Sequence, residues 1–362
     1  MVKELSHLER VQAALADEPV DRLPVYPIAC GVSRQLLDGG NMTYEQWARS
    51  AENYANGFEQ VHKKFDLDFA IGLMDLSVVA NDLGSHVRFD ENHTPSVDVP
   101  FINNMEDYDR LEFPEVNNGR IGTIIRGSEL MAKKLGKEVV TSAFLEGPLL
   151  VLTQSATAEK VFLDYIYEPD TVKRALRNIT DYEKGIVEAV GNTGVSAICW
   201  DYLWANYSVL DDSEYGSLEG DVFARELNSA TKDNGMAVAI HNCADLPHLD
   251  TQIKSFKPSI YSMAYYPLIE GSLSASQVIG QGYADETLVA GNLDPQAFEQ
   301  YTLEQVEEST KSLAQEVKTA LCERGLNSRY VLASGCEVPP TKTCRLENID
   351  TFVRAAKQYG SF

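Results

Sequence analysis

The stretch AVAIHNCADLPHLD, residues 237–250, is an apolar run that ends abruptly in histidine, asparagine and cysteine. A continuous run of Ala, Val and Ile predicts a strand buried on both faces, as in a parallel sheet. His241 and Cys243 follow it two positions apart, a spacing with which one loop can present an imidazole and a thiolate to a metal ion. The same spacing also arises by chance, so its meaning depends on the rest of the chain.

The pattern of a short apolar run, a polar turn and a helical segment recurs along the chain. The candidate strands are 23–28, 68–73, 138–144, 195–200, 236–241, 259–265, 287–292 and 330–335. The clearest helix is 302–325, where apolar residues recur close to one face and Gly325 supplies the stop. Buried strands alternating with helices predict a closed (β/α)8 barrel of the TIM type, with an open doubly wound sheet as the alternative.

The chain of 362 residues is interpreted as a single domain, 1–362, with an N-terminal helical extension. The segment from about 74 to 137 is too long for one crossover. Its stretch SHVRFDENHTPSVDVPFI, residues 85–102, predicts a hairpin-like insertion after the second strand.

The composition, 44% apolar and 23% charged, is typical of a globular protein. The net charge of −23 argues against nucleic acid as a partner, because phosphate binding requires a basic surface. No run approaches the roughly eighteen apolar residues of a membrane helix, and the charged N-terminus lacks a signal-peptide core. We therefore expect a cytoplasmic protein without a membrane partner, and a homodimer is compatible with the sequence. The 6 cysteines are expected to be core residues or ligands.

In a barrel of this kind the active site lies at the carboxyl ends of the strands. His241 and Cys243 follow the fifth strand, and Cys336 follows the eighth. Two thiolates and an imidazole favour Zn²⁺, and three protein ligands leave the fourth position open, as in a catalytic zinc site. We therefore predict one Zn²⁺ per chain on these three residues. The alternative is that Cys336 is a small buried residue and His241 a hydrogen-bonded core histidine.

Other polar residues follow other strands. Glu146, after the third strand, is predicted to be catalytic, as a fourth ligand or a partner of His241; capping of the next helix is the alternative. Asp201, after the fourth strand, is the second predicted catalytic carboxylate. Asn292, after the seventh, is a predicted substrate contact. Cys344 lies close enough in sequence to the eighth strand to compete as a ligand.

Aromatic residues are concentrated after the fourth and sixth strands. Aromatic side chains at a barrel mouth form flat apolar slots suited to a ring-shaped ligand. The residues predicted to bind substrate in this way are Trp200, Tyr202, Trp204, Tyr207 and Tyr265. Packing in a lid or an interface is the alternative.

Five stretches in order along almost the whole chain carry a family resemblance: RVQAALADEPVDRLPV, EGP, HNC, GNLDP and GCEVPP with LENI. Together they resemble the uroporphyrinogen decarboxylase superfamily, whose fold is a distorted (β/α)8 barrel. The His-x-Cys motif and the distant cysteine resemble the metal site of the zinc-dependent, corrinoid-linked methyltransferases in this superfamily. The decarboxylases lack that metal site. The resemblance implies zinc on His241, Cys243 and Cys336. Two departures are Ala244, where relatives usually have glycine, and TKTCR in place of a shorter bridge.

The superfamily branches by methyl donor and acceptor. One branch transfers methyl from a methylcorrinoid protein to coenzyme M, whose sulfonate would favour a basic pocket. Another takes methyl from a methoxylated aromatic compound and passes it to the Co(I) of a separate corrinoid protein. The rim segments here are aromatic and acidic, which favours the second branch, with zinc acting as a Lewis acid while the phenolate leaves. The resemblance thus implies an O-demethylase component; a coenzyme M methyltransferase, a metal-free decarboxylase-like enzyme and a non-catalytic barrel with structural zinc are the alternatives.

Overall fold

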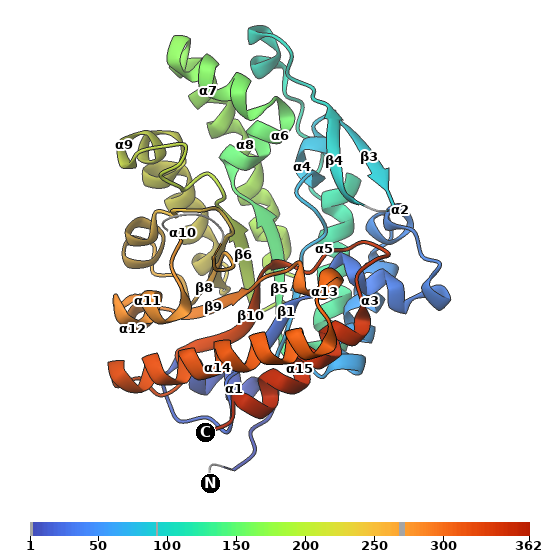
Figure 1. The fold of residues 1–362 in the computed structure, drawn as a ribbon. Coiled ribbons are helices and arrows are strands. Elements are labelled where there is room, and N and C mark those ends of the chain that lie inside the picture. The colour runs from blue at the N-terminus through green and yellow to red at the C-terminus, as the bar shows by residue number, and fades with distance from the viewer. Residues whose placement is uncertain (1–2, 92, 268–271) are drawn as a thin grey trace.

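The computed structural model describes residues 3–91, 93–267 and 272–362. Its centre is a sheet of 8 parallel strands, in the order β1-β10-β9-β8-β7-β6-β5-β2, curled into a barrel with helices outside it (Figure 1). The barrel strands are β1 (Val25–Ile28), β2 (Phe69–Gly72), β5 (Val140–Glu146), β6 (Ala197–Asp201), β7 (Ala237–Asn242), β8 (Ile260–Met263), β9 (Leu288–Leu293) and β10 (Tyr330–Glu337). The predicted barrel fold and all its strands are confirmed.

Helices follow most of the strands and cover the barrel (Figure 1). The longer ones are α3 (Ala51–Phe65), α5 (Gly119–Leu135), α7 (Ala158–Tyr167), α8 (Pro169–Gly191), α14 (Leu303–Arg324) and α15 (Leu346–Tyr359). The shorter ones are α1 (His7–Leu15), α2 (Tyr44–Ala48), α4 (Val78–Asp82), α6 (Pro148–Ser155), α9 (Asp212–Tyr215), α10 (Arg225–Asp233), α11 (Ala275–Gly280), α12 (Tyr283–Glu286) and α13 (Ala297–Gln300). The 3-10 segments are η1 (Gly31–Leu36), η2 (Asp38–Gly40) and η3 (Met105–Arg110), and the π-helical segments are η4 (Gly216–Ala224) and η5 (Asp250–Ser255).

Helix α14 shows how local sequence sets the bounds of an element. The Thr302 side chain accepts a hydrogen bond from the backbone N–H of Gln305, which satisfies a free donor of the first turn. At the other end Gly325 adopts φ 76°, a left-handed conformation in which a side chain would be strained. The predicted helix 302–325 is confirmed. Its apolar face packs on the barrel, although Leu303 at its start is 45% exposed.

The barrel is distorted at the seam between β1 and β2, where no backbone ladder joins the described strands. A buried carboxylate bridges this gap. Asp68, just before β2, accepts hydrogen bonds from the backbone N–H of Val25 at 2.7 Å, from Arg22 at 2.7 Å and from Arg10 of α1 at 2.8 Å. The N-terminal helix α1 is thereby fastened to the seam.

The insertion after the second strand is an antiparallel hairpin of β3 (His86–Asp90) and β4 (His93–Val99), as predicted. The hairpin rises beside α4 and α6, at the end of the barrel where the parallel strands finish (Figure 1). Residues 93–96 of β4 line the cavity described below, so the insertion forms one of its walls. Within the described ranges, no helix has both the length and the apolar composition needed to cross a bilayer.

Candidate metal centre and its cavity

The three predicted zinc ligands come together at the carboxyl ends of the strands. His241 is near the end of β7, and Cys243 follows that strand. Cys336 is near the end of β10, which is separated from β7 by β8 and β9 in the sheet. One donor atom from each of the three lies within 4.8 Å of the others. The curvature of the barrel therefore creates a compact set of one imidazole and two thiols from residues far apart in the sequence.

The His241 ring is oriented by a serine on the neighbouring strand. Parallel register pairs His241 with Ser262 of β8, and the ring Nδ1 lies 3.0 Å from the Ser262 Oγ. A ligand histidine usually hydrogen-bonds through its other ring nitrogen, which fixes the ring for the metal. This arrangement leaves Nε2 for a metal ion. The sequence analysis did not predict a role for Ser262. Its position opposite His241 follows only from the register of the two strands.

The two thiols differ in acidity because they share hydrogen bonds. The Cys243 thiol donates to the Cys336 sulfur, and this bond, together with the His241 imidazole and against the effect of burial, holds the pKa of Cys336 well below its usual range. The same contact and burial raise the pKa of the Cys243 thiol. The pKa of His241 is raised because contact with Cys336 outweighs burial. The lowered pKa favours the thiolate of Cys336, the form that binds metal ions.

Close backbone packing positions Cys336. A Cβ atom added at Gly335 would lie 2.0 Å from the backbone N of Tyr265 and 2.6 Å from the carbonyl carbon of Ala264. Backbone atoms cannot rotate away as a side chain can, so only glycine lets β10 approach the end of β8 this closely.

Gly335→Ala is expected to push β10 away from the end of β8 and to displace Cys336, with a loss of about 1–3 kcal/mol in the free energy of unfolding. Thermal unfolding and zinc content should both fall. Gly280→Ala is the matched control, because nothing lies within 4 Å of a Cβ added there. If both variants keep the same melting temperature and zinc content, the packing at Gly335 does not position the thiolate.

The three candidate ligands line a cavity of about 890 Å³ at the mouth of the barrel. Its other described lining residues are Leu73, Asp75, Leu76, His93, Thr94, Pro95, Ser96, Phe144, Gln154, Asp201, Tyr265, Asp294, Pro295, Gln296, Glu299, Glu337, Pro339, Pro340, Thr341 and Thr343. The volume is in the range of small-molecule sites.

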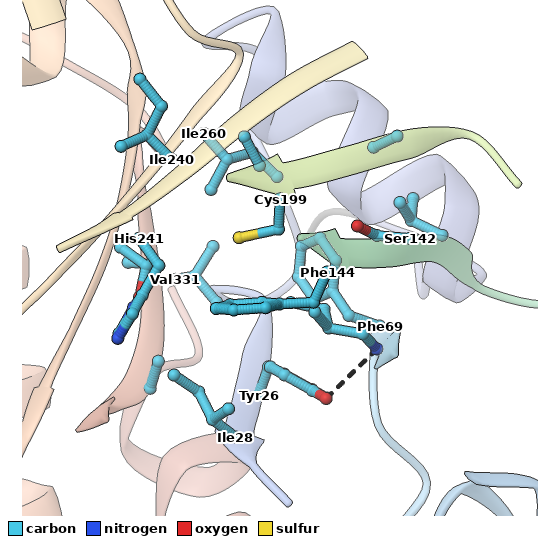
Figure 2. A pocket seen from close by; sticks show the side chains of 17 residues that line it. Tyr26, Ile28, Phe69, Ser142, Phe144, Cys199, Ile240, His241, Ile260 and Val331 are labelled. Atoms are coloured by element: carbon cyan, nitrogen blue, oxygen red, sulfur yellow. Dashed lines mark hydrogen bonds between the residues drawn. The ribbon is translucent and has the colours of Figure 1, made fainter. Parts of the chain in front are cut away.

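Beneath this cavity lies the packed lumen of the barrel, which encloses only about 50 Å³. Figure 2 shows the Phe144 ring lying across the lumen between Cys199 and Tyr26. Phe144 and His241 line both spaces, with their ring centroids 6.1 Å apart. They therefore form the floor of the cavity, and the lumen below it is filled by apolar side chains.

The two predicted catalytic carboxylates lie in different places. Asp201 lines the cavity and is 1% exposed; burial raises its pKa to about 7. Glu146 lies outside the described lining and outside the donor cluster. Its Oε2 accepts from the backbone N–H of Val79 at 3.4 Å, near the N-terminus of α4, and burial raises its pKa to about 8. Glu146 is therefore not one of the three clustered donors, and its role as a fourth ligand or a partner of His241 stays a prediction.

The predicted aromatic slot requires a correction. Trp200 and Tyr202 flank Asp201 and alternate with it, so they point out of the barrel, where their rings stack with centroids 6.0 Å apart. The Trp200 Nε1 donates to Thr231 at 3.1 Å, and the Tyr202 hydroxyl donates to Asn228 at 3.1 Å, both on α10. Since alternate residues face opposite sides of a strand, these two aromatics cannot share the cavity with Asp201.

Trp204 and Tyr207 also lie away from the described cavity lining. The Trp204 ring packs on Phe162 of α7, with centroids 5.1 Å apart. The Tyr207 ring stacks on His248 at 3.8 Å and is 51% exposed. Both residues belong to the loop after β6 and pack against neighbouring elements instead of the site.

Of the remaining predicted residues, Tyr265 lines the cavity, whereas Asn292 lies in a neighbouring surface hollow. Cys344 lies outside the donor cluster, and burial raises the pKa of its thiol to about 12.

The functional-site candidates that sequence reasoning missed are Phe144, Asp75, Glu299 and Glu337. Glu337 could have been predicted as a site residue, because it directly follows Cys336 in the GCEVPP stretch.

The fold and the donor cluster define a (β/α)8-barrel protein with a candidate metal centre at its mouth. A model of the uroporphyrinogen decarboxylase (URO-D) family matches residues 6–359, and the chain belongs to that family. It is 23% identical over 366 residues to the methylcobamide:CoM methyltransferase MtbA of Methanosarcina mazei, covering 98% of this chain and 99% of the relative. A uroporphyrinogen decarboxylase of Orientia tsutsugamushi is 32% identical, but over only 90 residues, or 25% of each chain.

Among solved structures, a methyltransferase from Methanosarcina mazei superposes with a TM-score of 0.78 at 20% sequence identity, over 98% of this chain and 99% of the other. At that identity the likeness concerns the fold. The resemblance of the sequence to the URO-D superfamily is confirmed by the family match.

Proposed function

We propose that this protein is a zinc-dependent methyltransferase that works with a corrinoid-carrying partner protein. The observation that carries the proposal is the convergence of His241, Cys243 and Cys336, with donor atoms within 4.8 Å of one another, on one cavity. The set fits zinc, since it combines two thiols with an imidazole whose other nitrogen is already hydrogen-bonded. Zinc bound there would supply a Lewis acid that stabilises negative charge on a substrate atom. The full-length similarity to MtbA supports methyl transfer as the reaction.

For the methyl donor we propose a methoxylated aromatic compound. Phe144 and Tyr265 offer rings, and Pro295, Pro339 and Pro340 offer flat apolar surfaces, for an aromatic ligand. In the reaction the methyl C–O bond breaks and its electron pair stays on the aryl oxygen, while the partner's Co(I) supplies the pair for the new Co–C bond. The phenolate formed then takes up a proton. This chain holds and aligns the substrate, and Asp201 lines the cavity where it can carry the proton for the departing oxygen.

Methyl transfer from a methylcorrinoid to coenzyme M is the second candidate, because two MtbA relatives carry that activity in their names. Coenzyme M has a sulfonate, which is normally held by Arg or Lys. Neither residue type occurs in the part of the cavity lining that the structure describes. The aryl ether therefore fits the cavity better than the sulfonate does.

The two candidates are separated by paired anaerobic assays on zinc-loaded protein. In one, free Co(I) cobalamin and 2-methoxyphenol are mixed with the protein and methylcobalamin formation is followed. In the other, methylcobalamin and coenzyme M are supplied and Co(I) release is followed. We expect about one zinc per chain and activity in the first assay. Activity in the second assay alone would establish the thiol acceptor, and no activity in either would overturn the proposed methyltransferase.

A further inference from the structure

We infer that the cavity selects an uncharged methoxyphenol and discriminates against aryl ethers that carry a carboxylate or sulfonate. This inference rests on the proposed function and names the substrate class of the same site. Three features of the cavity support it: the acidic residues in its wall, the contacts that three cations near it already make, and one buried oxygen that has no hydrogen-bond partner among the described residues.

The ionisable residues in the described lining are predominantly acidic. The lining carboxylates are Asp75, Asp201, Asp294, Glu299 and Glu337. The basic candidates are two histidines. His241 belongs to the donor cluster, and His93 is largely exposed and lies 3.4 Å from Asp90. Zinc on two thiolates and a neutral imidazole has no net charge, so it does not offset the carboxylates.

Three cations that neighbour or contact lining residues already have partners. Arg120 is buried and pairs with Asp75, with one Nη1 to Oδ1 contact at 3.3 Å. Arg34 is buried and donates to backbone carbonyls, the nearer at 2.6 Å. Lys342 lies between two lining threonines, but its ammonium is 3.4 Å from a carboxylate oxygen of Glu91. Each of these three cations therefore already has a partner, although the Nε atoms of Arg34 and Arg120 have no hydrogen-bond partner among the described residues.

Two of the lining carboxylates are held by neutral donors. Asp294 accepts from the backbone N–H of Gln296 at 2.9 Å, and Glu299 accepts from the hydroxyls of Thr343, at 2.7 Å, and of Thr341. Hydrogen bonds from amides and hydroxyls stabilise a carboxylate without cancelling its charge. The wall charges for which no cationic partner is found among the described residues are therefore those of Asp294 and Glu299, and they make the potential on their side of the cavity negative.

The third feature is independent of net charge. The Oδ1 of Asp201 is buried and has no hydrogen-bond partner among the described residues, and Asp201 lines the cavity. Buried polar atoms without a partner are uncommon, and one beside a ligand cavity is readily explained as a ligand contact. A phenol hydroxyl both donates and accepts, so it suits either protonation state of this carboxyl. A carboxylate or sulfonate can only accept.

The test uses two substrates that differ in charge and little else: 4-hydroxy-3-methoxybenzamide and 4-hydroxy-3-methoxybenzoate. Binding to the zinc-loaded protein is measured by calorimetry, and methyl transfer to Co(I) cobalamin is measured as kcat/KM. We expect both affinity and kcat/KM to favour the amide by roughly tenfold or more, because like charges within about 8 Å repel strongly in a partly buried site.

The possible outcomes separate the inference from the proposed function. Equal or better binding and turnover of the benzoate overturns the charge selection while methyl transfer stands. Preferential binding of the amide without demethylation of either compound supports the selection and overturns the proposed reaction. Binding of neither compound overturns both.

Variants locate the source of the selectivity. Asp294→Asn and Glu299→Gln each remove one charge from the wall, and each should lower the amide preference several-fold. Asp350→Asn is the matched control, since it removes the same charge from an exposed residue of α15 that pairs with Arg354. A preference unchanged in both wall variants, or lowered as much by the control, would show that the wall carboxylates do not select the substrate.

Discussion

Cys336→Ser is expected to lower methyl transfer by more than about a hundredfold and to remove most of the bound zinc. Loss of a group that only hydrogen-bonds to a metal ligand already weakens a site by about 10–100-fold, and loss of a ligand should exceed that. Serine matches the size of cysteine, but its hydroxyl does not ionise at neutral pH. In this protein Cys336 is also the thiol whose pKa its neighbours hold well below the usual range. The fold should persist, because the substitution is nearly isosteric.

Zinc content by elemental analysis, the anaerobic transfer assay and the melting temperature together test this expectation. Cys322→Ser is the control, since it removes an exposed thiol on α14, on the outer helical layer. Cys344→Ala tests the competing ligand, and we expect it to keep its zinc. Full zinc and full activity in Cys336→Ser would refute the proposed metal centre.

Asp68→Asn is expected to destabilise the fold by about 3–5 kcal/mol, the usual effect of removing one partner from a buried ion pair. Asp68 has no exposed surface, and Arg10 and Arg22 both contact it. Asparagine would remove the carboxylate that Arg22 contacts and would leave Arg10 with Asp21 alone, at the seam where β1 and β2 lack a backbone ladder. Chemical denaturation at neutral pH measures the loss.

Asp68 should also affect how the free energy of unfolding depends on pH in acid. Burial opposes its charge, but the hydrogen bond from His7 and the charges of Arg22 and Arg10 hold the pKa of Asp68 well below its usual range. A carboxyl with a depressed folded-state pKa contributes stability above its unfolded value of about 4, and this is lost as the pH falls below that value. The stability of Asp68→Asn should therefore depend less steeply on pH below about 4.

Asp66→Asn provides the comparison, because Asp66 is two residues away and contacts His7 and Lys357, but its side chain is 66% exposed. Exposed ion pairs contribute about 0–1 kcal/mol. Similar losses in the two variants would mean that the buried carboxylate does not hold the seam together.

The local sequence was sufficient to predict the barrel fold. Each strand appears as a continuous apolar run because both of its faces are buried, and each helix such as α14 has its own capping residue and stop. The position of His241 and Cys243 at a strand end followed from the same reading. Chain order then placed Cys336 on the same rim, because all strands of a (β/α)8 barrel point one way.

The prediction that Trp200 and Tyr202 form an aromatic slot at the barrel mouth was wrong, and the local sequence explains only part of the reason. Trp200, Asp201 and Tyr202 are consecutive, and strand alternation allows either the aspartate or the two aromatics to face the mouth. Register against β7, where Asp201 pairs with His241, places the aspartate there. Sequence alone does not state that register.

The sequence by itself determined the elements, their order, the direction of the strands and the end of the barrel where polar residues gather, because these follow from short-range periodicity and chain connectivity. Only the tertiary structure decided that Ser262 orients His241, that Gly335 lets β10 approach Tyr265, and that Asp68 closes the seam. These contacts join residues distant in sequence, and their geometry depends on barrel curvature and strand register, which no local pattern encodes.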